Sequence, residues 1–165
     1  MNEIYKCAVI TASDSTAAGI RVDASGPALI SLLQSEGFSD IHYEVSADEF
    51  DQLKKLMQNL CDDQKVNLIL TTGGTGFSPR DITPEATEAI IEKKAPGIAE
   101  AIRAYSMKFT SRAMLSRATA GIRGQCLIIN MPGSPKAVQE CFEIIRPILA
   151  HALDILCQNA SNCAR

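Results

Sequence analysis

Short apolar runs rich in β-branched residues alternate along this chain with longer segments in which apolar residues recur at helical spacing. Four of the short runs are expected to form strands, at residues 7–11, 41–45, 66–71 and 126–130. Two of them, around Leu68-Ile69-Leu70 and Leu127-Ile128-Ile129, are nearly continuous in apolar character, which is typical of strands covered on both faces. The pattern predicts an α/β fold in three layers, a mostly parallel sheet with helices on both faces.

The expected helices begin where a capping or turn residue comes just before a proline. These sites are Ser25-Gly26-Pro27, Thr83-Pro84 and Ser134-Pro135. A proline in the first turn of a helix loses no hydrogen bond, because the N–H at that position has no partner within the helix. Gly37 is expected to end the helix that begins near Ser25.

The last helix, expected at residues 135–157, has an apolar face wider than a single stripe. Phe142 and Ile145 lie on this face, and Ile148 and Ile155 extend it. Burial against another subunit explains so wide a face, and deep burial within the monomer explains it nearly as well.

The composition favours one domain with its own core. The chain has 165 residues, 46% of them hydrophobic, and no linker or repeat divides it, so residues 1–165 are predicted to form a single domain. No apolar run approaches the roughly 20 residues of a membrane span, and the chain does not open with a secretory signal pattern. We therefore expect a cytoplasmic protein with no membrane partner.

The six cysteines include no CxxC pair and no histidine-rich neighbourhood, which argues against both a zinc site and a disulfide framework. Cys7 and Cys126 open apolar runs, and Cys141 lies in an amphipathic segment. Each is therefore expected to be a buried, reduced thiol.

The net charge of -3 at pH 7 argues against nucleic acid as a partner, because broad binding of that kind needs a basic surface. Between Ala101 and Gln139, however, the sequence contains no acidic residue. Six basic residues fall in this segment: Arg103, Lys108, Arg112, Arg117, Arg123 and Lys136. A solvated helix face accounts for part of this bias, but the segment favours an anionic ligand in a concave site.

Polar segments follow all four predicted strands. They are residues 11–15, 46–48, 71–76 and 130–134. In a parallel sheet the carboxyl ends of the strands meet at one edge, and ligands bind in the crevice there. The sequence thus predicts a ligand site at this edge.

The segment after the third strand, Thr72-Gly73-Gly74-Thr75-Gly76, has the composition of an anion-binding loop. Glycine permits positive φ angles and close approach, so successive N–H groups can point at one phosphate. A tight strand-to-helix turn is the plain alternative. The segment matches neither the Walker pattern nor GxGxxG, so neither a P-loop ATPase nor a dinucleotide fold is supported.

Three acids lie near this loop or on neighbouring strand ends: Asp14, Asp48 and Asp81. An acid beside an anion-binding backbone is unfavourable unless a cation or a catalytic task uses it. Asp48 is equally well placed to cap the following helix, and Asp14 to form a turn. Convergence on one edge favours the functional interpretation, in which the carboxylates hold Mg²⁺ for phosphoryl or nucleotidyl transfer.

A second polar element, residues 113–118, places a serine hydroxyl next to fixed cations. Either Arg117 or Arg112 is expected to clamp a phosphate near Ser116, because a guanidinium matches phosphate geometry in bidentate fashion.

Several long motifs, in the same order, resemble the molybdenum-cofactor enzyme family of Mog and the G domain of gephyrin. They are LTTGGTGFSPRDITPEAT at 70–87, APGIAEAIR at 95–103, AMLSRATAGIRG at 113–124 and LIINMPGSPKAVQECF at 127–142. The strings TASDS and DASGPAL near the start match as well. The resemblance runs from about Lys6 to Leu156, nearly the whole chain.

The resemblance implies a molybdopterin adenylyltransferase, which uses Mg-ATP to place AMP on the terminal phosphate of molybdopterin and releases pyrophosphate. It also implies a homotrimer. Asp48 and Asp81 match two acids regarded as essential in the family and are the candidate catalytic and Mg²⁺-binding residues. The candidate nucleotide-binding residues are Ser13, Asp14, Thr72, Gly73, Gly74, Thr75 and Gly76. The candidate pterin-binding residues are Ser116, Arg117, Pro132, Gly133 and Ser134.

Two other identities are considered. The related MoaB branch shares the fold and the loop, although the strings APGIAEAIR and GIRGQCLIIN favour the Mog and gephyrin branch. The second alternative is a non-catalytic protein that binds or carries the pterin. Acids beside the phosphate argue against it, because a protein that only binds anions gains nothing from them.

The 165 residues contain no counterpart of the molybdate-inserting domain found in the fused eukaryotic proteins, so hand-over to a separate inserting protein is expected. Residues 158–165 match no motif of the family.

Overall fold

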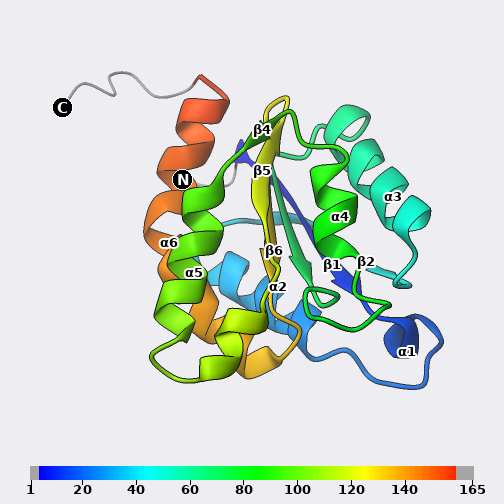
Figure 1. Cartoon of the computed structure of the whole chain (residues 1–165). Helices are drawn as coiled ribbons and strands as arrows, with labels where there is room; N and C mark the ends of the chain where they lie inside the picture. The colour runs from blue at the N-terminus through cyan, green and yellow to red at the C-terminus, as the bar shows by residue number, and fades with distance from the viewer. Residues whose placement is uncertain (1–3, 159–165) are drawn as a thin grey trace.

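Six strands form one sheet in the computed structural model, which describes residues 4–158 (Figure 1). In sheet order they are β2 (Asp40–Ser46), β1 (Lys6–Ala12), β3 (Leu68–Thr72), β6 (Cys126–Met131), β5 (Ala120–Arg123) and β4 (Lys93–Lys94). The first four run parallel, whereas β5 pairs antiparallel with both β6 and β4. The four parallel strands therefore bring their carboxyl ends to one edge of the sheet.

Helices cover both faces of this sheet. One face carries α2 (Ser25–Ser35), α5 (Pro96–Ser106) and α6 (Pro135–Leu156), and the other carries α3 (Phe50–Asp62) and α4 (Thr83–Glu88). Figure 1 shows α5 and α6 on one side of the strands, with α3 and α4 on the other. Two short elements, α1 (Asp14–Ala17) and the 3-10 helix η2 (Ser111–Leu115), follow β1 and α5. The predicted three-layer α/β fold is confirmed.

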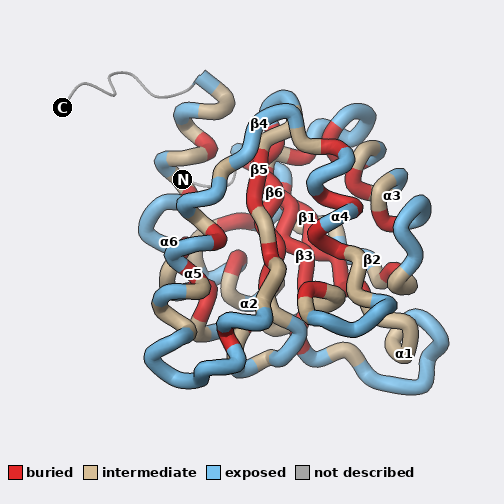
Figure 2. The backbone as a smooth tube through the Cα atoms, in the orientation of Figure 1, coloured by how far each residue is buried: buried red, intermediate tan, exposed pale blue. Residues whose placement is uncertain are grey.

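The central strands bury side chains on both faces, because successive residues of a strand point to opposite sides. In β3, Leu68 and Leu70 pack into the cluster under α2, α5 and α6, while Ile69 packs under α3 and α4. Every residue of β3 and β6 is buried, and Figure 2 shows the buried residues concentrated in the strands, with the helices around them part buried and part exposed. The loops at the strand ends thus start from fixed positions.

The four predicted strands agree with the structure to within two residues, but β4 and β5 were not predicted. They have only two and four residues, and the sequence of β5, Ala-Gly-Ile-Arg, lacks a β-branched run. Gly124, with a φ of 54°, lies in the tight turn that leads from β5 into β6. Pairing with a buried central strand makes these residues a strand, where local propensity alone does not.

Two of the predicted helix starts need a correction. Thr83 is the first residue of α4, and its hydroxyl, which has no hydrogen-bond partner among the described residues, does not cap the helix. Ser134 caps α6 as predicted, since its hydroxyl accepts a hydrogen bond from the N–H of Ala137. Ser25, in contrast, is the first residue of α2, and its N–H donates to the carboxylate of Asp23. The capping side chain of α2 thus lies two residues upstream of the serine.

The apolar arc of α6 is largely buried within the protein itself. Phe142 and Ile145 are buried in the core, while Ile148 and Ile155 remain 41% and 50% exposed. The exposed part of the arc leaves room for a subunit contact. Within residues 4–158, no helix combines the length and apolar character that a membrane span requires.

Cys7, Cys126 and Cys141 are buried free thiols, as predicted. Burial raises the pKa of the Cys7 thiol to about 12, and the charge of Asp40 also acts to raise it, so this thiol stays protonated at neutral pH. Cys163 lies outside the described residues.

Candidate active site

The glycine loop after β3 separates two cavities at the carboxyl edge of the sheet. Gly73 and Gly74 line the first cavity, of about 220 Å³. Thr75 and Gly76 line the second, of about 270 Å³. Ligands in the two cavities would therefore lie on either side of one four-residue loop.

The conformation of this loop requires glycine at its first two positions. Gly73 has a φ of 94° and Gly74 a φ of 63°, angles that L side chains rarely adopt. A Cβ at Gly73 would also lie 2.3 Å from the carbonyl oxygen of Ala12. Gly76 has no positive φ, and there a Cβ would lie 2.9 Å from Asp81 Oδ2. A side chain at the third position would therefore have to displace the carboxylate of Asp81.

Asp48 is held at the first cavity by an exchange of hydrogen bonds with Asp14. The N–H of Asp14 donates to Asp48 Oδ2 at 2.9 Å, and the N–H of Asp48 donates to Asp14 Oδ1 at 3.0 Å. Helix α3 is capped without a side-chain hydrogen bond from Asp48, so the helix-capping alternative is not what the structure shows. Asp48 is instead a residue of the strand-end cluster.

The guanidinium of Arg80 completes this cluster. It donates to both oxygens of Asp14, at 2.9 and 3.0 Å, and to Glu49 Oε1 at 2.7 Å. These hydrogen bonds lower the pKa of the Asp14 carboxyl below its ordinary value. Asp14 is thus ionised and its oxygens are bound by other residues of the protein, and it does not line the first cavity.

Two buried oxygens beside Gly74 have no hydrogen-bond partner among the described residues: Asp48 Oδ1 and Thr83 Oγ1. A Cβ at Gly74 would lie 3.0 Å from the first and 2.4 Å from the second. Burial raises the pKa of the Asp48 carboxyl, and the charges of Asp14 and Asp81 raise it further. An unpaired, partly desolvated carboxylate oxygen is therefore available to a ligand at this point.

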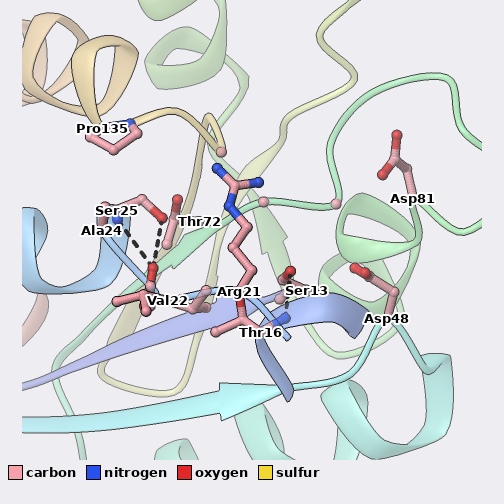
Figure 3. Close-up of a pocket in the computed structure, with 16 residues that line it drawn as sticks. Ser13, Thr16, Arg21, Val22, Ala24, Ser25, Asp48, Thr72, Asp81 and Pro135 are labelled. Carbon is pink, nitrogen blue, oxygen red and sulfur yellow. Dashed lines mark hydrogen bonds between the residues drawn. The ribbon is translucent and has the colours of Figure 1, made fainter. Parts of the chain in front are cut away.

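Asp81 lines the same cavity, and Figure 3 shows it on the same side as Asp48. Its Oδ2 accepts a hydrogen bond from the N–H of Ser78 at 2.9 Å. In the described part of the chain, no cluster of three or more acidic, histidine or cysteine side chains is arranged to hold a metal ion. Asp48 and Asp81 fit a Mg²⁺ ion that takes its other ligands from phosphate and water, which is how Mg²⁺ is usually bound in nucleotide sites.

Arg117 fastens the segment that carries Asp81. Its Nε donates to the carbonyl oxygen of Gly76 and its Nη2 to that of Asp81, both at 2.7 Å, and its guanidinium pairs with Glu85. Its main-chain N–H donates to the carbonyl of Thr75 at 2.9 Å. Arg117 lines neither cavity, so the guanidinium predicted to clamp a phosphate holds both ends of the 76–81 segment.

The basic segment predicted between residues 101 and 139 is partly neutralised by the protein itself. Three of its guanidinium groups bind carbonyl oxygens or acids: Arg103, Arg117 and Arg123. Arg112 lines the second cavity, and its guanidinium has no partner among residues 4–158. Of the two arginines predicted to clamp a phosphate, Arg112 is the one available to a ligand.

The family model described as "Probable molybdopterin binding domain" matches residues 8–151. The chain belongs to this family. It is 42% identical over 153 residues to the molybdopterin adenylyltransferase of Helicobacter pylori (strain J99), and the alignment covers 92% of this chain and 87% of that protein. The resemblance seen in the motifs is thereby confirmed.

Solved structures in the family share the whole architecture. The molybdopterin biosynthesis enzyme MoaB from Thermus thermophilus superposes with a TM-score of 0.87 at 40% identity, covering 93% of this chain and 96% of that one. The Mog protein from Mycobacterium ulcerans superposes with a TM-score of 0.87 at 37% identity, covering 92% and 99%. Because the two TM-scores are equal, the fold does not separate the MoaB branch from the Mog branch.

The predicted family residues divide between the cavities differently from the prediction. Ser13 and Thr72 line the first cavity with Gly73 and Gly74, whereas Thr75 and Gly76, also predicted to bind nucleotide, line the second. The Thr72 hydroxyl donates to the carbonyl of Pro132 at 2.7 Å, which ties the ends of β3 and β6 together. The glycine loop thus serves both sides of the site.

The predicted pterin-side residues are likewise split. Ser116 and Pro132 line the second cavity, while Gly133 lines the first. Ser134 lines neither cavity, since its hydroxyl caps α6. A Cβ at Gly133 would lie 3.3 Å from the Cα of Gly73, so the two turns pack against each other.

Sequence reasoning missed the acid Asp23, which organises the far wall of the first cavity. Its carboxylate accepts hydrogen bonds from the hydroxyls of Thr11 and Tyr43 and from the N–H groups of Ser25 and Gly26. The string DASGPAL contained a usable signal, because an Asp two or three residues before N–H groups of a first helical turn is a common cap. Arg21 and Arg80 were missed too, and no local pattern marks either one.

Proposed function

We propose that this chain is a molybdopterin adenylyltransferase that transfers AMP from ATP to the terminal phosphate of molybdopterin and releases pyrophosphate. The observation that carries the proposal is the pair of cavities on opposite sides of the glycine loop, with Asp48 and Asp81 at the first of them. Membership of the family and 42% identity to an enzyme of that name support the same activity.

The first cavity suits the nucleotide. It is lined by the positive-φ glycines Gly73 and Gly74 and by the hydroxyl of Ser13, a set that suits phosphate oxygens. Thr72 lines it as well, with its hydroxyl bound to the carbonyl of Pro132. The second cavity suits the pterin phosphate and its ring system, because Ser116 and Arg112 lie there beside apolar side chains such as Ile102 and Leu115.

Mg²⁺ is proposed to be held by Asp48 and Asp81 together with oxygens of the nucleotide. The buried, unpaired Asp48 Oδ1 supports this assignment. When bound, the ion offsets phosphate charge, which is the usual contribution of a metal to nucleotidyl transfer.

The chain's own groups then act by positioning. An oxygen of the pterin phosphate forms a bond to the α-phosphorus of ATP as the bond from that phosphorus to the bridging oxygen of pyrophosphate breaks, and the bond electrons leave with pyrophosphate. No side chain needs to form a covalent bond, so alignment of the two phosphates and neutralisation of their charge account for the rate. The loop between the cavities fixes that alignment.

We also propose that the protein assembles as a homotrimer and works in the cytoplasm as one domain spanning residues 1–165. The exposed Ile148 lines an apolar groove between α5 and α6 together with Ile98, Ala101 and Ile144, which supports a subunit contact there. We further propose that the adenylylated pterin is handed over to a separate molybdate-inserting protein.

The test is an incubation of the purified protein with molybdopterin and Mg-ATP, with pyrophosphate release and the mass of the pterin product as readouts. Asp81→Asn is the matched variant, because the amide oxygen can still accept the hydrogen bond from Ser78. We expect product from the wild type and a large loss in Asp81→Asn with unchanged folding. Pterin binding without any product would instead favour the carrier alternative.

A further inference from the structure

The loop between α1 and α2 carries an arginine that faces the first cavity. Arg21 lines this cavity, and Figure 3 shows its side chain extending into it with the guanidinium far from the loop backbone. The base of the side chain is fixed, because the N–H of Arg21 donates to the carbonyl of Ser15 at 3.1 Å. Its guanidinium makes no hydrogen bond or ion pair with any residue between 4 and 158.

Two other arginines near the glycine loop, Arg80 and Arg117, are already bound by the protein, and Arg112, whose guanidinium no described residue binds, lines the second cavity. Arg80 is paired with Asp14 and Glu49, and Arg117 with Glu85 and two carbonyl oxygens. These guanidinium groups hold loops in place. Arg21 differs from them because its donors remain available to a ligand.

Most of the charged residues that line the first cavity are acidic, so a free cation there would favour phosphate binding. Among the described residues that line it, Arg21 is the one cation, and the other charged residues are the acids Asp23, Asp48 and Asp81. A polyphosphate entering beside three carboxylates meets repulsion that the glycine N–H groups offset only in part. A guanidinium offers a permanent charge and a planar fork of donors that matches phosphate oxygens.

We propose that Arg21 binds the phosphate chain of ATP and thereby makes the first cavity selective for nucleoside polyphosphates over AMP. This inference rests on the proposed function and adds a binding residue to it. Arg21 contacts the phosphates beyond the α position, so the group that leaves as pyrophosphate is held from the loop between α1 and α2. The carboxylates and the guanidinium then approach the polyphosphate from different parts of the chain.

The test is equilibrium binding of Mg-ATP and of AMP, measured by calorimetry on the wild type, Arg21→Ala and Arg21→Lys. Lys55→Ala is the control, since it removes an exposed charge of α3 that lines neither cavity. We expect Arg21→Ala to weaken Mg-ATP binding about tenfold or more, with AMP binding changed by less than about twofold. Arg21→Lys should be intermediate, and Lys55→Ala should match the wild type.

Each outcome decides the proposal. Unchanged ATP affinity in Arg21→Ala would overturn it while leaving the adenylyltransferase function intact, provided the wild type binds ATP and forms product. If Arg21→Ala lost affinity for ATP and AMP equally, and Arg21→Lys bound both as tightly as the wild type, the proposed selectivity for polyphosphates would be overturned. A wild type that binds no ATP at all would remove the proposed function and this inference with it. Thermal unfolding of each variant separates a binding defect from a folding defect.

Discussion

Asp14 and Asp48 each accept a hydrogen bond from the other's main-chain N–H, across 34 positions of sequence. The exchange joins the loops that follow β1 and β2. It uses one oxygen of Asp48 and leaves the other, Oδ1, buried and unpaired beside the glycine loop. The exchange thus orients the Asp48 carboxylate toward the first cavity, and burial of that carboxylate destabilises its charged form.

Asp48→Asn should therefore separate activity from stability. We expect activity to fall at least about a hundredfold, because a charge that faces the reacting phosphates is lost. Burial raises the pKa of the Asp48 carboxyl, so its charged form weakens folding at neutral pH, and the amide should raise Tm by roughly 1–3 °C. Differential scanning calorimetry beside the product assay checks both effects; a lower Tm in the variant would contradict this account.

Arg80 acts on the site through Asp14. Arg80→Ala should lower kcat about tenfold, because Asp14 loses both of its guanidinium hydrogen bonds and Asp48 loses its orientation. Stability should change little, since the ion pair is exposed. Glu49→Gln is the matched control, because it removes the charge of one partner of Arg80 and keeps the contact with Asp14. Equal kcat losses in the two variants would show that the Asp14 contact is unimportant.

Arg117 should prove to be a positioning residue. Arg117→Lys keeps the charge and loses the fork that holds the carbonyls of Gly76 and Asp81, so we expect kcat to fall about tenfold with little change in pterin KM. Arg123→Lys is the control, because Arg123 makes a comparable set of contacts, to Asp62 and a carbonyl, away from both cavities. Steady-state kinetics with both substrates varied distinguishes the two roles, and a large rise in pterin KM alone would restore direct pterin binding by Arg117.

Gly73→Ala should be strongly unfavourable. The positive φ and the 2.3 Å approach to the Ala12 carbonyl both oppose a methyl group, so we expect a loss of more than about 1 kcal/mol in the free energy of unfolding and loss of ATP binding. Gly97→Ala is the comparison, because Gly97 lies in the first turn of α5 with nothing within 4 Å of an added Cβ, so the free energy of unfolding should not fall. Urea unfolding of the two variants gives the comparison, and a neutral Gly73→Ala would refute the strained loop.

Asp23 should give the protein part of its acid sensitivity. Burial raises the pKa of this carboxyl, but the hydrogen bonds it accepts outweigh burial, and the pKa lies below the ordinary 3.8. Its contribution to folding is therefore complete above pH 3.8 and is lost as the pH falls through the lowered value. Asp23→Asn should be less stable than the wild type at pH 7, and the difference should narrow below about pH 4. Urea midpoints measured from about pH 7 to about pH 3 test this, with Asp51→Asn as an exposed-acid control; a constant difference would contradict the linkage.

Much of the site was predictable because its parts are local in sequence. The apolar runs placed the strands, and the expected parallel direction of the strands placed Asp48 and the glycine loop at one edge. Glycine at 73 and 74 follows directly from what the turn demands of φ. The division of the loop between two cavities, at Gly74 and Thr75, was not predictable, since it depends on how α5 and η2 fold back beside it.

The partners of the charged residues were the least predictable part. Arg80 lies 66 positions from Asp14, and Arg117 lies 36 from Asp81. Nothing in the local pattern distinguishes an arginine that binds a carbonyl from one that binds a substrate, so Arg117 was assigned to the pterin and Arg21 to nothing. Only the three-dimensional arrangement shows which guanidinium groups are already occupied.

The single loop between the cavities has a consequence for how the enzyme would move. If both substrates bind as proposed, their separation is set by four consecutive residues, Gly73 to Gly76, anchored to a buried strand. Bringing the substrates together would then need no closure of one domain upon another. In such an enzyme the rate of turnover would be limited by the binding and release of ligands, because no large conformational change is needed to align the substrates.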